Sequence, residues 1–257
     1  MADLKVISYN VNGIRSAIKK GLLDWLKGVD PDVLCLQELK ADDAAFDTTP
    51  FEKMGYQVFT LPAVKKGYSG VAILTKMKPD HVVKGCGIKE YDDEGRFIRV
   101  DIGDLTVISV YIPSGTTGEI RQAVKMKYLD DFYTFIHKLE KERPKLLICG
   151  DYNICHKEID IHNPISNKDT SGFKPEERAW MSKFFDSGFI DTFRYFHKEA
   201  HQYSWWSQRA NSRANNKGWR IDYISATKNL EKNLVDSKMF QEAVHSDHCP
   251  VYLKIKK

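Results

Sequence analysis

Short β-branched and aromatic runs, each followed by a turn, dominate the pattern of apolar positions along this chain. Runs of this kind, bounded by Gly, Pro, Asn and Asp, predict β-strands rather than helices. The expected strands are Leu4–Tyr9, Val33–Gln37, Gln57–Leu61, Val71–Thr75, Phe97–Ile102, Thr106–Ile112, Leu146–Cys149, Ser204–Ser207, Ile221–Ala226 and Val251–Ile255.

Helical periodicity is strongest in three segments. Ser16–Lys27 carries apolar residues on one face and stops before Gly28, and Glu119–Glu142 carries them at helical spacing throughout. Pro175–Ser187 opens with a proline and two glutamates, which suits a helix N-terminus. Because the strands do not alternate strictly with helices, we expect an α/β fold of two packed, mainly antiparallel or mixed sheets flanked by helices. No repeat or proline-rich linker marks a boundary, so residues 1–257 are expected to form a single domain.

The composition narrows the class of protein. The chain has 257 residues, of which 42% are hydrophobic and 29% charged, and this excludes a disordered or collagen-like protein. Apolar stretches are too short to span a bilayer, and apolar residues begin at Leu4 without room for a signal peptide, so we expect no membrane association. Five cysteines without C-x-x-C spacing favour a reduced, cytoplasmic protein over a metal–thiolate site.

The positive charge is concentrated in one segment. His201–Lys228 contains five basic residues and one acid, which gives +4, and the whole chain also carries +4 (39 basic against 35 acidic residues), so the remainder sums to zero. Two tyrosines and three tryptophans are interleaved with these charges. Such a segment suits phosphate backbones and unstacked bases or sugars. A solvated loop with a few core aromatics is the alternative, and the pattern alone leaves both open.

Polar residues stand at the ends of several expected strands, where a turn alone would suffice. These residues are Asn10, Asn12, Glu38, Tyr111, Asp151, Asn153, Asp222, Asp247 and His248. Any one of them could cap a turn. If the strands share an orientation, however, carboxylates and an imidazole meet around one pocket. Carboxylate and amide oxygens hold hard cations such as Mg²⁺, and an Asp near a His suits general-base and orienting roles. The pattern therefore predicts metal-assisted hydrolysis of an anionic ester.

The same residues lie in motifs that resemble a known family. The motifs, in order along nearly the whole chain, are Ser8–Arg15, Leu36–Glu38, Tyr111–Pro113, Gly150–Asn153, Gly218–Tyr223 and Ser246–Pro250. They resemble the exonuclease III family of apurinic/apyrimidinic endonucleases. Asn10, Glu38 and the Asp247–His248 pair would mark only the wider endonuclease/exonuclease/phosphatase superfamily. Trp219–Tyr223, together with Glu158–Asp160 and Asn163–Pro164, resembles its DNA-repair branch in particular.

This resemblance implies a four-layered α/β sandwich with the active site at one end of the two sheets. It implies Mg²⁺- or Mn²⁺-dependent cleavage of duplex DNA 5′ to an abasic site, which leaves a 3′-hydroxyl and a 5′-deoxyribose phosphate. Some 3′→5′ exonuclease activity and a monomeric enzyme are expected as well.

The resemblance also implies roles for individual residues. Glu38 resembles the principal metal ligand, with Asn10, Asn12 and Asp247 nearby. Asp151 matches the residue that activates water, and Asn153 one that orients the water or the phosphate. His248, held by Asp222, would stabilise charge at the phosphate. Contacts to the phosphate or leaving group would come from Tyr111, Asn10 and Asn167, and the pocket for an extruded deoxyribose from Trp205 and Trp219.

At three positions the chain departs from relatives. Asn12 is neutral where some members carry Asp, Ser114 stands where some carry Asn, and Arg209 stands where some insert an apolar side chain into the duplex. Two other functions compete with a repair nuclease. A phosphatase of inositol phosphates or lipids is disfavoured by the basic aromatic segment and by the lack of a membrane-binding helix. A non-catalytic DNA-binding module is disfavoured by the intact acidic residues and His248.

Overall fold

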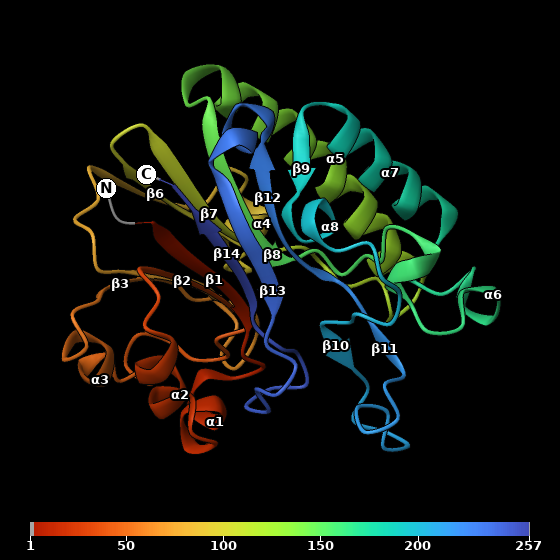
Figure 1. Ribbon diagram of the computed structural model, residues 1–257, viewed down its shortest axis with the longest axis horizontal. Coiled ribbons are helices and arrows are strands. Elements are labelled where there is room, and N and C mark those ends of the chain that lie inside the picture. The colour runs from red at the N-terminus through yellow and green to blue at the C-terminus, as the bar shows by residue number, and fades with distance from the viewer. Residues whose placement is uncertain (1–2, 257) are drawn as a thin grey trace.

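Two six-stranded β-sheets packed face to face form the centre of the molecule (Figure 1), as the computed structural model describes it for residues 3–256. In the first sheet the strand order is β13-β14-β1-β2-β4-β3. Its strands are β1 (Leu4–Asn10), β2 (Val33–Gln37), β3 (Gln57–Leu61), β4 (Val71–Thr75), β13 (Leu234–Met239) and β14 (Val251–Ile255).

The second sheet has the order β5-β6-β7-β8-β12-β9. Its strands are β5 (His81–Lys84), β6 (Phe97–Ile102), β7 (Leu105–Tyr111), β8 (Lys145–Asp151), β9 (Phe189–Asp191) and β12 (Asp222–Thr227). Within residues 3–256, parallel pairing is confined to β1–β2 and β7–β8. Both sheets are therefore mixed and mainly antiparallel, as the sequence predicts.

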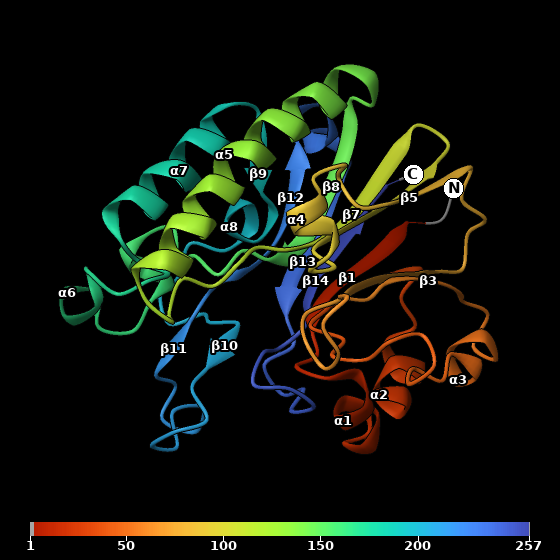
Figure 2. The ribbon, with the colours of Figure 1, turned by 180° about the vertical axis from the view of Figure 1, so that it is seen from behind.

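Apolar side chains fill the space between the sheets and cover both outer faces. Val6, Val33, Val107 and Leu147 belong to the cluster between the sheets, where each is fully buried. Helices α5 (Glu119–Glu142) and α7 (Pro175–Asp186) cover the outer face of the second sheet (Figure 2). Helices α1 (Ile14–Lys19), α2 (Leu22–Val29) and α3 (Thr49–Glu52) cover the first. This arrangement confirms the predicted four-layered α/β sandwich.

Shorter elements complete the fold. The helices are α4 (Lys89–Asp92), α6 (Pro164–Asn167) and α8 (Thr192–Phe196), with 3-10 turns at Glu158–Asp160 and Lys228–Asn233. A two-stranded ribbon, β10 (Trp205–Trp206) and β11 (Gly218–Trp219), projects from one end of the sandwich (Figure 1). We call this ribbon and its connecting turn, residues 205–219, the arm. No helix in the part of the chain described here is long and apolar enough to cross a bilayer.

The prediction of one helix over Ser16–Lys27 was wrong. The segment forms α1 and α2, which are separated at Gly21, where φ is +95° and the helical path is interrupted. Four strands, β5, β9, β11 and β13, were not predicted from the sequence. β13 reads Leu-Val-Asp-Ser-Lys-Met, without a sustained apolar run, because it is an edge strand that needs to bury little.

Candidate active site

Strand directions bring the polar residues to one end of the sandwich. β1, β2, β7 and β8 end there, and antiparallel β12 and β14 begin there. In register, Asp222 is opposite Asp151, and Asn10 is opposite Gln37, the residue before Glu38. The strand-end residues therefore meet at a single edge to which both sheets contribute.

Asn10 joins the two sheets at this edge. Its Nδ2 donates to Glu38 Oε1 and to Asp151 Oδ2, each at 2.9 Å. Its Oδ1 accepts from the backbone N–H of Asn12 at 3.0 Å. Glu38 follows the first sheet and Asp151 ends a strand of the second, so a single amide sets the spacing of two carboxylates from different sheets.

His248 is held from the other side by Asp222. His248 Nδ1 lies 2.9 Å from Asp222 Oδ2, and that oxygen also accepts from Ser204 Oγ at 2.6 Å. The other ring nitrogen, Nε2, lies 4.0 Å from Asp151 Oδ2. Asp222 thus fixes the ring orientation and leaves Nε2 facing the pocket.

Asn153 and Tyr111 flank Asp151. The backbone N–H of Asn153 donates to Asp151 Oδ1 at 2.8 Å, and its Nδ2 donates to the carbonyl oxygen of Ile112 at 2.9 Å. The Arg96 guanidinium lies 4.8 Å from the Tyr111 ring centroid. Burial, together with the charges of Glu38 and Asp151, raises the pKa of Tyr111 well above its usual value, so the phenol keeps its proton as a hydrogen-bond donor.

Lys40 is a site residue that was not predicted from the sequence. Its Nζ lies 2.8 Å from Glu38 Oε2 and also donates to Asn12 Oδ1. Asn12 Nδ2 in turn donates to Asp247 Oδ1 at 2.8 Å, and Trp205 Nε1 donates to Asp247 Oδ2 at 3.2 Å. The motif Gln-Glu-Leu-Lys places Lys40 two residues after Glu38, which was the only signal for it in the sequence.

The ionisable groups here have strongly shifted pKa values. Burial, reinforced by the charges of Asp222 and Glu38, raises the pKa of Asp151 to about 8. Burial alone would lower the pKa of His248, but Asp222 outweighs it and raises the value to about 10. Burial would likewise raise the pKa of Glu38, but Lys40 outweighs it and lowers the value. The site therefore combines a carboxylate that titrates near neutral pH with a cationic imidazole.

An aromatic cavity of about 310 Å³ opens directly onto these groups. Trp205 and Trp219 form one wall, with ring centroids 6.1 Å apart and ring planes at 89°. The residues that line the cavity are Glu38, Tyr111, Ser114, Thr116, Asp151, Asn153, Thr170, Ser171, Gly172, Trp205, Trp219, Ile221, Asp247 and His248. Ser114 and both tryptophans, which the sequence singled out, are thus found among the residues that line this cavity.

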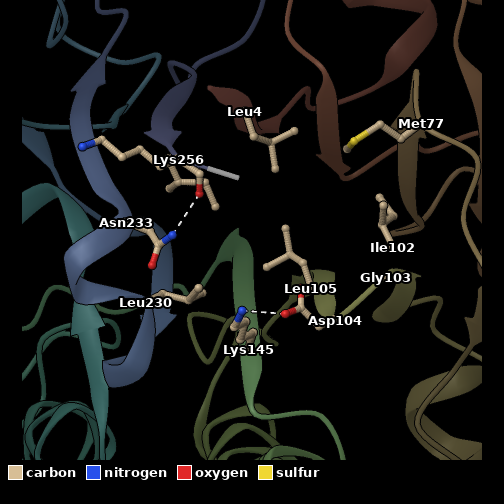
Figure 3. Close-up of a pocket in the computed structure, with 11 residues that line it drawn as sticks. Leu4, Met77, Ile102, Gly103, Asp104, Leu105, Lys145, Leu230, Asn233 and Lys256 are labelled. Atoms are coloured by element: carbon tan, nitrogen blue, oxygen red, sulfur yellow. Dashed lines mark hydrogen bonds and ion pairs between the residues drawn. The ribbon is translucent and has the colours of Figure 1, made fainter. Parts of the chain in front are cut away.

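A second cavity, of about 290 Å³, lies at the opposite end of the sandwich (Figure 3). Leu4, Leu105 and Ile255 contribute apolar walls, and an ion pair between Lys145 and Asp104 lies at its edge. It lacks the convergent carboxylates and imidazole of the first cavity, so the chemistry belongs to the first.

Two of the predicted site residues, Asn167 and Arg209, neither line the cavity nor join the hydrogen-bond network around Asp151. Asn167, in α6, donates through Nδ2 to the carbonyl oxygens of His162 and Asn163. Arg209 lies in the exposed turn of the arm. Each lies a few positions in the sequence from residues that line the cavity, but neither lines it. A contact between either residue and the substrate would therefore lie outside the pocket.

Part of the positive charge in the arm and directly after it is paired inside the protein. Arg220 is fully buried and bonds Asp160 and Asp191, and Arg213 donates to the carbonyl oxygens of Ser246, Gln241 and Ala243. Arg209 and Lys217 remain exposed. Some basic residues of this segment are therefore structural, whereas Arg209 and Lys217 are available to contact a ligand.

The donor set fits a hard divalent cation. Ligand atoms of Glu38, Asp151 and His248 all lie within 4.8 Å of one another. His248 at a pKa of about 10 is protonated at neutral pH and has no lone pair to offer on Nε2. The available ligands are therefore carboxylate oxygens of Glu38 and Asp151, with Asp247 linked to them through Asn12. Such oxygens suit Mg²⁺ or Mn²⁺ rather than a soft metal.

Comparison with known proteins assigns the chain and its fold to a family. The model of the Endonuclease/Exonuclease/phosphatase family matches residues 7–248. The chain belongs to this family. The Exodeoxyribonuclease of Bacillus subtilis is 39% identical over 254 residues, which cover 98% of this chain and 99% of that protein. The DNA-(apurinic or apyrimidinic site) endonuclease of Dictyostelium discoideum is 38% identical over 254 residues, covering 97% of this chain and 70% of that one.

A solved relative of this Endonuclease/Exonuclease/phosphatase family protein shows the same architecture. The AP endonuclease from Archaeoglobus fulgidus superposes with a TM-score of 0.92 at 31% identity and covers 99% of this chain and all of that one. The predicted family, fold and nuclease class are thereby confirmed. The roles of single residues stay predictions.

Proposed function

We propose that this protein is a DNA-repair endonuclease that hydrolyses the phosphodiester bond 5′ to an abasic site. The products are a 3′-hydroxyl and a 5′-deoxyribose phosphate, and the same centre removes nucleotides from 3′ ends. The observation that carries the proposal is the tryptophan-walled cavity, which opens directly onto Asp151 and His248. An aromatic pocket beside the catalytic groups is suited to hold a nucleotide that has turned out of the duplex.

The cavity suits a sugar that has lost its base. An abasic nucleotide has neither stacking nor pairing to give up, so its rotation out of the helix costs less than that of an intact one. Trp205 and Trp219 present apolar surface to the bare deoxyribose, and a sugar that still carries a base meets that wall.

The residues of the site divide the hydrolysis among them. Asp151, whose pKa of about 8 suits a base near neutral pH, takes the proton from the attacking water. Asn153 orients that water or the phosphate. The His248 imidazolium, held by Asp222, stabilises the negative charge that develops on the phosphate oxygens as the bond to the 3′-oxygen breaks.

Glu38, with Asp247 beside it, would hold the divalent cation, for which we propose Mg²⁺ or Mn²⁺, and Asp151 stays free to act as the base. When bound, the ion supplies charge neutralisation at the phosphate. Asn10 and Asn12 keep these carboxylates apart and oriented through the hydrogen bonds described above.

The working form follows from the same features. We propose a monomer, one catalytic domain over residues 1–257, that acts on double-stranded DNA in the cytoplasm. The similarity to a bacterial exodeoxyribonuclease and the five free cysteines support the cytoplasmic assignment. Exposed Arg209 and Lys217 on the arm support contact with the duplex backbone.

The test is cleavage of a duplex with a single abasic site, with and without EDTA, beside the intact duplex. We expect incision only 5′ to the abasic site and only with divalent metal. Glu38→Ala should weaken metal affinity far more than DNA affinity, while Glu142→Ala, which alters an exposed carboxylate at the end of α5, should change neither. Full activity in EDTA would remove the metal from the mechanism. Release of inorganic phosphate from a soluble inositol-phosphate headgroup, without incision of abasic DNA, would favour the phosphatase instead.

A further inference from the structure

A buried ion pair lies behind the wall of the cavity, between α5 and α7. Lys125 Nζ lies 2.6 Å from Glu177 Oε1, and both side chains are fully buried. Elsewhere these helices meet through apolar side chains such as Leu129, Phe132 and Trp180. Replacement of a buried ion pair by apolar side chains is often neutral or stabilising, so stability alone does not account for charges at this position.

The pair binds two backbone segments that line the cavity. Lys125 Nζ donates to the carbonyl oxygen of Asn153 at 2.8 Å. Glu177 Oε2 accepts from the backbone N–H groups of Gly172 at 2.6 Å and Lys174 at 2.9 Å. Asn153 and Gly172 both line the cavity. One ion pair therefore links the segment after β8 to the segment before α7.

Neighbouring polar groups leave the Glu177 carboxylate little freedom. Gln122 Nε2 donates to Glu177 Oε1 at 3.1 Å, and Ser171 Oγ lies 3.4 Å from the same oxygen. Ser171 Oγ also donates to Gln122 Oε1 at 2.8 Å. A carboxylate that accepts so many hydrogen bonds has one defined position, and the backbone that donates to it is fixed as well.

Gly172 lies against the six-membered ring of the Trp219 indole. A Cβ atom at this glycine, whose φ is +98°, would lie 2.9 Å from Trp219 Cζ3 and 3.1 Å from the carbonyl oxygen of Asn153. The backbone at Gly172 and the indole ring are thus in contact without space between them. A shift of this backbone by a few tenths of an ångström would move the tryptophan or open the cavity.

We infer that Lys125 and Glu177 are positioning residues that set the shape of the sugar cavity, and thereby the discrimination between an abasic and an intact nucleotide. The inference rests on the proposed function. Neither residue touches the reacting atoms. They act through Asn153 and Gly172, which hold Trp219 at the distance that admits a bare deoxyribose.

The test compares three variants by the ratio of kcat/KM for abasic-site incision to kcat/KM for 3′-end removal from intact duplex. Lys125→Met removes the charge, and the double variant Lys125→Met/Glu177→Leu replaces the pair with apolar side chains. Lys127→Met, on the exposed face of the same helix, is the control. Because both activities use the same catalytic groups, a loss of folded protein lowers them equally and leaves the ratio unchanged.

We expect the ratio to fall by roughly tenfold in both pair variants, because a misplacement of about 1 Å caused by a mutation far from the chemistry can cost ~10²-fold in rate. Lys127→Met should keep the wild-type ratio. If the pair variants melt at lower temperature but keep the ratio, the pair is structural and the inference is overturned. If Lys125→Met fails to fold, the test rests on the double variant, because that variant leaves no unpaired buried charge. Failure of the wild type to incise abasic DNA would instead refute the proposed function.

Discussion

Four residues of the site adopt a backbone conformation that side chains ordinarily avoid. Asn12, Glu38, Lys40 and Asn153 have φ values of +44°, +53°, +50° and +54°. Residues in this left-handed region cost of order 1–3 kcal/mol each and persist where the surroundings over-determine them. All four lie within three residues of a strand end, at the sheet edge where the two carboxylates converge, so the strain accompanies that convergence.

At the residue scale, the assignment of Asp151 as the general base is the most direct one to test. Asp151→Asn is nearly isosteric but cannot accept a proton, so turnover should fall by ~10²–10⁴ while fold and DNA affinity persist. Single-turnover cleavage of abasic duplex measures the loss, and Asp186→Asn, at the end of α7 and away from the site, serves as the control. Cleavage within threefold of wild type would place the base elsewhere.

The role of Asp222 predicts a change in pH dependence. Asp222 opposes burial and holds the pKa of His248 at about 10, so the imidazolium persists across the neutral range. In Asp222→Asn the burial that lowers this pKa is no longer outweighed, and His248 loses its proton at lower pH. On the alkaline side of the pH–rate profile, the cleavage rate of Asp222→Asn should therefore fall at a lower pH than that of wild type. An alkaline limb in its original place would contradict the role of Asp222 as the partner of His248.

At the element scale, the arm combines charges with two different uses. Arg209 is the exposed arginine of the arm. Two roles for its side chain can be distinguished by the salt dependence of DNA binding and by comparing abasic with intact duplex. If Arg209 binds a backbone phosphate, Arg209→Ala should weaken binding to abasic and intact duplex alike and reduce the salt slope by about one unit. If its side chain instead fills the gap left by the extruded sugar, the same variant should affect abasic DNA selectively and leave the slope unchanged.

The aromatic wall of the arm predicts selectivity. Trp219→Ala and Trp205→Ala enlarge the cavity, so discrimination against intact nucleotides should loosen while the catalytic groups remain. The ratio of abasic to intact cleavage measures this effect. If both variants kept the wild-type preference, the pocket would lie elsewhere and the arm would serve only to bind the duplex.

A buried charge network anchors the arm and predicts a stability effect. Asp160, almost fully buried, accepts from Arg220 Nε and Arg194 Nη2, each at 2.7 Å. Burial would raise its pKa, but Arg220 and Arg194 outweigh it and lower the value to about 2. Asp160→Asn leaves Arg220 undercompensated in the interior and should cost about 3–5 kcal/mol of unfolding free energy at neutral pH.

This effect has a defined pH window. The pKa of Asp160 in the folded protein is about 2, which lies below the ordinary value of 3.8. The ionised carboxylate therefore stabilises the fold fully above pH 3.8, and this stabilisation is lost as the pH falls through 2. Urea unfolding of wild type and Asp160→Asn should therefore converge as the pH approaches 2. A difference that stays constant with pH would show that the asparagine acts through packing.

Elements with strong local patterns were predictable from the sequence, and the others were not. Glu119–Glu142 matches α5 at both ends, because one apolar face of a long helix leaves a periodic signal. β5 and β13 lie at sheet edges, where neighbours rather than composition define the strand. The break at Gly21 could not be predicted because the apolar spacing continues through it.

At the scale of the whole molecule, the candidate site was predictable only where sequence motifs carried it. Glu38, Asp151, Asp222 and His248 stand at strand ends in recognisable strings, and the fold brings them together. The Lys125–Glu177 pair joins residues 52 positions apart, and nothing in either segment marks it. A charge within an otherwise amphipathic helix looks like a solvated one until the tertiary structure buries it.

The division of the site between both sheets predicts how activity is lost. Asn10 and Glu38 come from the first sheet and Asp151 and Asp222 from the second, so the site exists only while the sheets are packed together. Activity and circular dichroism should therefore disappear along the same urea transition. Inactivation at distinctly lower urea than the loss of secondary structure would indicate that the arm or the site opens separately.

The place of β14 in the first sheet has a consequence for the newly made chain. This strand, which closely follows His248, lies between β13 and β1 and pairs with both. During translation, β1 and Glu38 emerge first, yet β1 has no partner on that side until β14 has been synthesised. His248 also arrives only then. A growing polypeptide therefore has no complete site before β14 has been synthesised, although Glu38 and Asp151 are already present.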